Sequence, residues 1–403
     1  MESAHNPSSK CVEILKDKLY WVSDKNPPQD HSEDFFFNVD KQLVYNPIAN
    51  DFGPLDLGKT YRFVTELEEL LKDPSYSKVK LFHHTSLDSA KRTNAACLMG
   101  CFQVLVLGKT AEEAWEPFSK VQPPLAGFRD TSSLKTSLEV SILDVLRGLE
   151  YAVKLKWFDL KTFNLQDYEF YAQRENGNLH WIVPGRFAAF SGPANKPKIF
   201  GGVKSLTPED HIPTFKKYNV KMVIRLNNKE YDTDRFTNHG INHQDFYFID
   251  GSCPKDALVQ KFVETCEKET GAIAVHCKAG LGRTGTMIAC YIMKHYKFPA
   301  AALVGWIRLA RPGSVLGSQL QFLIDKEKGF HQLSNSSPVF QSISSLVQSF
   351  WSRREENPLN NKAESIQISL NNEELIPQEL VTPKFGDSQQ ADKFREIKAS
   401  RRP

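Results

Sequence analysis

A cysteine, an arginine and three glycines lie within one short stretch of the sequence, residues 276–285. Gly280 and Gly282, between Cys277 and Arg283, let the backbone turn its N–H groups inward without a Cβ clash. Such amides at a helix start attract anions. They lower the pKa of a nearby thiol below its free value of about 8.5, and the planar guanidinium of the arginine can bind two phosphate oxygens. The stretch predicts a cysteine nucleophile that attacks a phosphoester; the alternative is a buried structural cysteine.

The segments on either side of this stretch predict the elements that would position it. Residues 271–275 are uncharged and β-prone, which indicates a buried strand, and the apolar run 286–293 indicates a helix. Cys277 would then lie where a strand meets a helix N-terminus. The phosphate-binding loop between the two elements comprises Lys278, Ala279, Gly280, Leu281 and Gly282.

Breaking a phosphoester requires a proton donor for the leaving oxygen. Asp250 follows a predicted strand over residues 246–249 and precedes Pro254, as expected for such a group. Asp245 is the alternative, although it falls inside the preceding strand pattern. We expect Thr284 to hydrogen-bond the departing thiolate when the phosphocysteine is hydrolysed.

Two further residues are candidates for supporting roles. We expect His276 to organise the loop rather than to move protons. Gln319 lies downstream of residues 311–314 and could position the hydrolytic water, the alternative being a residue of a surface loop. No histidine has a convincing metal-ligand spacing, so neither a metal nor a cofactor is expected.

The composition narrows the class of protein. A chain of 403 residues suggests two or three domains, and 40% hydrophobic residues suffice for real cores. The net charge of +3 gives no reason to expect nucleic acid or a membrane surface as a partner. No apolar run approaches the ~20 residues of a membrane span, and the first residues resemble no targeting peptide. Seven cysteines without a CxxC pair fit a reducing compartment, cytosol or nucleus.

The amino-terminal half repeats the element order of this region. Strands are predicted near residues 18–22, 35–37 and 78–84, with a helix over 60–71. Three pairs of residues share one constant offset: Arg92 with Arg283, Thr93 with Thr284, and Trp115 with Trp306. Thr85 or Ser86 stands where the nucleophile would be, and that loop contains no glycine. We infer a degenerate internal duplication whose first copy lacks cysteine catalysis and shapes the substrate groove.

The remaining sequence completes an α/β pattern. After a helix over 138–155, Thr207 and Pro208 predict a capped helix start, and residues 220–226 predict a strand. Alternating strands and helices indicate a mostly parallel sheet flanked by helices in each domain, with function at the strand ends. The predicted divisions are a degenerate domain over 1–165, a linker over 166–180, a catalytic domain over 181–330 and a largely disordered tail over 331–403.

The tail contains three candidate signals. Ser337-Pro338 and Thr382-Pro383 are candidate sites for proline-directed kinases, although most such dipeptides in a tail are silent. The apolar residues of 366–376 could form an export or partner motif, the alternative being a solvated linker.

The sequence resembles the mitotic-exit dual-specificity protein phosphatases, the cell-division-cycle-fourteen family. The loop has the Cys-x5-Arg-Ser/Thr signature of cysteine-dependent phosphatases. The resemblance covers roughly residues 10–330, and further matches lie at 51–55, 91–96, 128–130, 181–185 and 249–252. It implies two tandem phosphatase-like domains with an inactive first copy, a substrate cleft at their interface, and Asp250 as the general acid.

The same resemblance implies partners and a location. The partners are phosphoprotein substrates of proline-directed kinases, with phosphoserine-proline sites made by cyclin-dependent kinases. The location is cytoplasm and nucleus, with spindle or centrosome association. Residues assigned to the substrate groove are Glu169, Glu175, Phe128 and Arg129.

One feature departs from the family pattern. Members of the family carry an acidic cluster in the linker, which favours substrates with a basic residue downstream of the phosphosite. Glu169 matches that cluster and Glu175 lies nearby, but Ala172 and Asn178 stand where two further acids are expected. We therefore expect a weaker preference for a basic residue.

Two rival functions remain. Phosphoinositide phosphatases have a similar loop, but those acting on highly charged rings carry a lysine where this sequence has Leu281. A scaffold that only binds phosphopeptides would not need Cys277, Arg283 and Asp250 together. That second function suits the first half of the chain better than the second.

Overall fold

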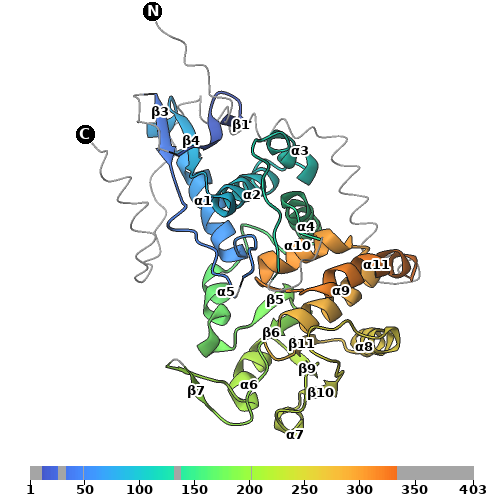
Figure 1. Ribbon diagram of the computed structural model, residues 1–403. Helices are drawn as coiled ribbons and strands as arrows, with labels where there is room; N and C mark the ends of the chain where they lie inside the picture. Colours follow the sequence, from blue (N-terminus) through green and yellow to red (C-terminus); the bar gives the residue numbers. More distant parts are fainter. Residues whose placement is uncertain (1–10, 26–32, 49, 131–137, 201, 334–403) are drawn as a thin grey trace, which may run out of the picture.

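Two α/β units follow one another along the chain, the first blue to teal and the second green to orange in Figure 1. The computed structural model describes residues 11–25, 33–48, 50–130, 138–200 and 202–333. Both units contain a mixed sheet flanked by helices, which confirms the predicted fold class. Within the described residues, none of the helices combines the length and apolarity that crossing a bilayer requires.

The amino-terminal unit is built on a four-stranded sheet. Its strands are β1 (Cys11–Leu15), β2 (Leu19–Ser23), β3 (Asp34–Phe37) and β4 (Lys80–Thr85), in the order β1-β2-β4-β3. β4 runs parallel to β2 and β3, whereas β1 and β2 are antiparallel. The helical segments are α1 (Leu57–Lys72), η1 (Pro74–Tyr76), α2 (Ser89–Leu105), α3 (Ala111–Trp115), η2 (Glu116–Phe118) and α4 (Ile142–Lys154).

A short helical connection leads to the second unit, whose five-stranded sheet has the order β10-β9-β11-β6-β5. All neighbours in this sheet are parallel except β5 and β6. The connection is α5 (Leu165–Ala172) and η3 (Arg174–Asn176). The strands of the sheet are β5 (His180–Val183), β6 (Phe187–Phe190), β9 (Val220–Arg225), β10 (Asn242–Asp245) and β11 (Ala272–His276). A separate antiparallel hairpin consists of β7 (Ile199–Phe200) and β8 (Val203–Lys204). The helices are α6 (Pro208–Lys217), α7 (Asp234–Thr237), α8 (Asp256–Lys268), α9 (Gly282–Tyr296), α10 (Ala300–Ala310) and α11 (Ser318–Leu333).

The two units share one continuous apolar core. α4 of the first unit lies against α10 of the second near the centre of the molecule (Figure 1). A Cβ on Gly148 of α4 would lie 2.3 Å from Ala302 O, and one on Gly305 of α10 would lie 2.8 Å from Val145 Cα. The helices approach this closely only because both positions are glycine. The units are therefore packed against each other rather than loosely tethered.

The strand predicted over residues 246–249 is wrong, because β10 lies four residues earlier. Phe246 N still donates to Arg225 O at 2.9 Å, but β9 ends there, so the following residues run past the end of their neighbour. Phe246 and Phe248 are buried, whereas Tyr247 and Ile249 are more than half exposed. The apolar alternation therefore reports an extended segment that covers the core without a strand partner.

The predicted end of the catalytic domain differs from the observed helix. α11 continues to Leu333, so the predicted domain end at residue 330 falls inside a helix. Residues 334–403, with the predicted disorder, Ser337-Pro338, Thr382-Pro383 and the 366–376 motif, lie outside the described residues.

Candidate active site

The predicted loop connects β11 to the start of α9. β11 is fully buried between β9 and β6, and it ends at His276. Gly280 has a φ of +71°, and a Cβ there would lie 2.0 Å from Phe190 O. Only glycine fits this position, and the tight turn it allows aims the loop amides at one point.

Cys277 lies inside this turn with only 3% of its surface exposed. Its Sγ accepts a hydrogen bond from Gly280 N at 3.2 Å. Because the N-terminus of α9 follows directly, its unpaired amides and dipole stabilise negative charge here. The sulfur is thus held close to a loop amide, at the end of the helix that attracts anions.

The amides can point inward only because the loop carbonyls point outward and find donors. Lys278 O accepts from Gly192 N at 3.0 Å. Ala279 O accepts from Arg311 Nη2 at 2.9 Å and from Ser191 Oγ at 3.2 Å, and Gly280 O accepts from Arg311 Nε at 2.7 Å. Arg311, which is 1% exposed, therefore anchors two consecutive carbonyls. A buried carbonyl without a donor would cost about 1–3 kcal/mol, which explains the need for this outer layer.

Arg311 also joins the loop to the connection between the units. Its Nη1 contacts Asn178 O at 2.6 Å, Asn178 Oδ1 at 3.1 Å and His180 Nδ1 at 2.7 Å. Asn178 Nδ2 in turn donates to Ser191 Oγ at 2.9 Å. Arg311, Asn178 and Ser191 are supports that no motif predicted, although an arginine directly after an apolar helix was a usable signal for Arg311.

His276 holds the loop as a neutral imidazole. Its Nδ1 lies 2.9 Å from Cys277 O, and since a carbonyl only accepts, Nδ1 carries the proton. Nε2 then accepts from Tyr231 Oη at 2.6 Å, and Tyr231 accepts from His243 Nε2 at 3.0 Å. Burial lowers the pKa of His276 to about 3 and that of His243 to about 4. Neither ring is charged near pH 7, so the hydrogen bonds from His243 through Tyr231 to His276 orient the loop and carry no proton to the substrate.

Arg283 points its guanidinium across the same turn. It is 4% exposed, and its Nη1 donates to Phe248 O at 3.1 Å. Arg283 Nε and Thr284 Oγ1 are buried without a hydrogen-bond partner among the residues that the structure describes. Buried polar atoms are normally paired. A phosphate in the loop would give Arg283 Nε an acceptor, and Thr284 lies beside Arg283 in the first turn of α9.

Asp250 and Asp245 differ in what holds them. Asp250 Oδ1 lies 3.1 Å from Arg283 Nη2, and its side chain is 72% exposed. Both carboxylate oxygens of Asp245 instead accept from the buried Arg225 guanidinium, from Nε at 2.7 Å and from Nη2 at 2.9 Å. Asp250 is therefore free to reach a leaving group beside Arg283, whereas Asp245 is committed to a structural ion pair.

Gln319 is fully buried, so the alternative of a surface loop is wrong. Its Oε1 accepts from Leu316 N at 2.9 Å and its Nε2 donates to Ser252 O at 3.1 Å. A Cβ on Gly282 would lie 2.9 Å from Gln319 Oε1. Gln319 thus connects the start of α11 to the Asp250 loop, beside the phosphate-binding loop.

A cleft of about 990 Å³ opens between the two units and reaches the loop at Ala279 and Leu281. Glu169 lines it, as predicted, but both carboxylate oxygens are bound by Arg62 of α1, at 2.7 to 3.0 Å. Glu175 is exposed on η3 and is not among the residues that line this cleft. Of the four residues predicted for the substrate groove, the structure places only Glu169 in the cleft, and its carboxylate is already paired with Arg62.

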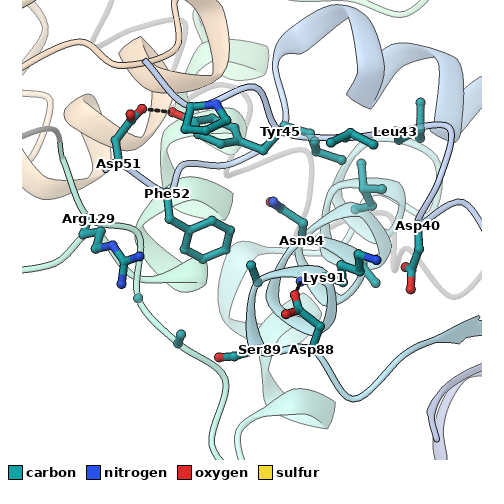
Figure 2. A pocket seen from close by; sticks show the side chains of 18 of the residues that line it. Asp40, Leu43, Tyr45, Asp51, Phe52, Asp88, Ser89, Lys91, Asn94 and Arg129 are labelled. Carbon is teal, nitrogen blue, oxygen red and sulfur yellow. Dashed lines mark hydrogen bonds between the residues drawn. The ribbon is translucent and has the colours of Figure 1, made fainter. Parts of the chain in front are cut away.

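Two other predicted groove residues need correction. Phe128 is 0% exposed and packs on Phe52, so it cannot contact a substrate. Arg129 lines a separate cavity of about 500 Å³ within the first unit (Figure 2). The motif 128–130 therefore supports the fold: Phe128 pairs with Val140 and Arg129 with Phe52 through backbone bridges.

Comparisons with known proteins agree with this division into two units. Residues 13–152 match the family model of the dual specificity protein phosphatase, N-terminal half. Residues 176–319 match the Swiss Army Knife protein, DSP-PTPase phosphatase domain.

Curated relatives are similar over most of the chain. The dual specificity protein phosphatase CDC14A of Homo sapiens is 47% identical over 79% of this chain and 54% of its own length. CDC14C of Homo sapiens is 42% identical over 80% of this chain and 72% of its own. The tyrosine-protein phosphatase CDC14 of Saccharomyces cerevisiae is 36% identical over 80% and 60%. The chain spans about half to two thirds of the length of several relatives it matches. This chain belongs to the CDC14 family of dual-specificity protein phosphatases.

Proposed function

We propose that this chain hydrolyses phosphoserine, phosphothreonine and phosphotyrosine in proteins through a phosphocysteine intermediate. One observation carries the proposal: Cys277 lies among the loop amides, followed within the same turn by an arginine that is ion-paired to an exposed aspartate. Nucleophile, phosphate ligand and proton donor are thus within one site, as covalent catalysis of phosphoryl transfer requires.

The first step forms a phosphorus–sulfur bond and breaks the ester bond. The Cys277 thiolate attacks phosphorus in line with the leaving oxygen, and the loop amides and Arg283 bind the non-bridging oxygens. Asp250, as the acid, delivers its proton to the departing serine, threonine or tyrosine oxygen. Charge develops where fixed donors already lie, which is the largest source of rate enhancement in such sites.

The second step returns the free enzyme. Water attacks the phosphocysteine, its proton passes to the Asp250 carboxylate, and the phosphorus–sulfur bond breaks to release inorganic phosphate. The Thr284 hydroxyl donates a hydrogen bond to the departing thiolate. Every proton is carried by a side chain of this chain, so the mechanism requires no added cofactor.

The substrate class follows from the relatives and the cleft. Relatives named dual specificity or tyrosine-protein phosphatase suggest that both alcohol and phenol esters are substrates. The cleft between the units has room for the peptide around the phosphosite. We therefore include phosphoserine-proline and phosphothreonine-proline sites made by proline-directed kinases, such as those of the cell cycle.

The test is turnover of a phosphopeptide panel by the purified chain in excess chelator. We expect hydrolysis of phosphotyrosine and phosphoserine-proline peptides at undiminished rates. A rate abolished by chelator, or hydrolysis of phosphoinositides in vesicles but of no phosphopeptide, would contradict the proposal.

A further inference from the structure

The cleft between the two units carries more positive than negative charge. Two carboxylates, Asp56 and Glu169, line it together with six cations: Lys59, Arg62, Arg174, Lys198, Lys204 and Arg311. Burial lowers the pKa of the two lining histidines, His180 and His211, that of His211 to about 4, so neither is charged near pH 7. A peptide approaching the loop therefore meets a basic surface.

Both carboxylates of the cleft already have cationic partners within the protein. Asp56 accepts from the Lys59 amide at 2.9 Å, which caps α1, and it also pairs with the Lys59 ammonium. Glu169 accepts three hydrogen bonds from the Arg62 guanidinium, in the bidentate geometry that makes such pairs strong. A lysine or arginine of a peptide would have to displace an internal partner to use either carboxylate.

Three cations remain to meet a ligand. Arg174 of η3 and Lys198, just before β7, have no carboxylate within ion-pair distance among the described residues. Lys204 of β8 has only a distant one, Asp210 at 3.8 Å, and its side chain is 56% exposed. The cations come from the connection and from the β7–β8 hairpin, so they reach the cleft from two segments far apart in sequence.

The two positions without the expected acids add no negative charge. Ala172 lines the cleft with a methyl group. The Asn178 amide is fully engaged, because it donates to Ser191 Oγ and accepts from Arg311. A basic residue of the substrate finds no free carboxylate at either place.

We propose that this cleft selects phosphopeptides with acidic or additionally phosphorylated residues near the phosphosite and disfavours those with lysine or arginine there. The inference rests on the proposed phosphatase activity and names its substrate class. It goes further than a weakened preference for basic residues, because the cleft charge favours the opposite sign. Doubly phosphorylated segments are the substrates that this charge fits best.

Binding to the Cys277→Ser variant tests the preference separately from catalysis. One phosphoserine-proline peptide is made with glutamate, phosphoserine, alanine or lysine three residues after the phosphosite. Fluorescence anisotropy should give affinities that fall in the order phosphoserine, glutamate, alanine, lysine. Each added charge changes the affinity by about two- to fivefold, as for partly exposed ion pairs. The spread should shrink in high salt, where exposed charges are screened.

Charge-reversed variants complete the experiment. Arg174→Glu with Lys198→Glu, in the same background, should reverse the order of the glutamate and lysine peptides. The matched control is Lys268→Glu, an exposed residue of α8 outside the cleft lining, which should leave the order unchanged. Tightest binding of the lysine peptide, or an order that the double variant leaves unaltered, would overturn the inference. Ordered binding without turnover by the unsubstituted chain would instead contradict the phosphatase activity and leave the charge preference standing.

Discussion

The two strand–loop–helix units of this chain differ in what the amides of the loop contact. In the second unit, the loop after β11 aims its amides at Cys277, as Gly280 N does at 3.2 Å. In the first, the carboxylate of Asp40 accepts from Ser86 N and from Thr85 Oγ1, both at 2.9 Å. The first loop thus contains its own anion, and the second is built to receive one.

The paired arginines and threonines show the same contrast. Arg92 donates to Ser23 Oγ and Pro123 O, and Thr93 Oγ1 accepts from Ala126 N. Arg283 Nε and Thr284 Oγ1 have no such partner among the described residues. In the first copy the paired arginine and threonine are therefore held by partners within the fold, whereas their counterparts in the second keep polar atoms available to a substrate.

The largest expected effect comes from moving the nucleophile between the copies. Cys277→Ser should reduce turnover by more than about 1000-fold, because a hydroxyl is a poor nucleophile at neutral pH. Adding Ser86→Cys to that variant should restore nothing, since Asp40 already holds the amide that an anion would need. Steady-state turnover of an aryl phosphate measures both, and any rescue by Ser86→Cys would contradict the comparison.

The acid should matter only where the leaving group needs a proton. Asp250→Asn should slow phosphoserine peptides by about 10²–10⁴-fold and aryl phosphates with good leaving groups much less. Asp245→Asn is the control, because that carboxylate is bound by Arg225. Equal losses of kcat on both substrates in Asp250→Asn would exclude it as the proton donor.

Arg311 should act through the loop that it supports. Arg311→Met removes donors from Ala279 O and Gly280 O, and the displaced amides should lower kcat by about 100-fold. Arg311→Lys should recover only part of the loss, since one ammonium cannot span both carbonyls and Asn178. Unchanged kcat in Arg311→Met, with thermal stability also unchanged, would contradict a positioning role.

Opening the first loop should affect stability and not catalysis. Asp40→Ala removes two hydrogen bonds to a carboxylate and should lower the free energy of unfolding by about 2–3 kcal/mol. Denaturant unfolding measures this loss, and turnover of an aryl phosphate should stay at the wild-type rate. A fall in turnover without a fall in stability would mean that the first loop takes part in the reaction.

Buried histidines in both units predict a loss of stability in mild acid. Burial lowers the pKa of His83 and His276 to about 3, well below the ordinary value of 6.5. Their contribution is complete above pH 6.5 and is lost as the pH falls toward 3, because the unfolded chain binds the protons first. Denaturant unfolding between pH 7 and 4.5 should show this slope, and His83→Phe should reduce it.

The sequence predicted the loop well because its chemistry is local. Cys277, Gly280 and Arg283 lie within one turn, so their spacing alone defines an anion site. The position after a predicted strand favours Asp250 over Asp245, and the Arg225–Asp245 pair, which joins residues that neighbouring strands bring together, adds a reason that no local pattern shows. Arg311 lies far from Asn178 in sequence, and only the packing of the second unit on its connection shows their contact.

The predicted strand and groove failed for a related reason. The alternation over 246–249 reports which side chains are buried, and it carries no information on where the neighbouring strand ends. Phe128 and Arg129 lie in a well-matched motif, yet a motif can preserve packing as well as substrate contact. The Glu169–Arg62 pair joins the connecting helix α5 to α1 of the first unit, more than a hundred residues earlier, so no local pattern could reveal that the acidic residue is already paired.

The most direct test of the contrast between the loops is to identify the residue that carries the phosphoryl group. A Thr284→Ala variant should slow the second step, so the intermediate should accumulate with an aryl phosphate and survive rapid quenching. Mass spectrometry of the digested chain should then find one phosphoryl group, on Cys277. Phosphate on any residue of the first unit, or turnover with no adduct on Cys277, would contradict the account.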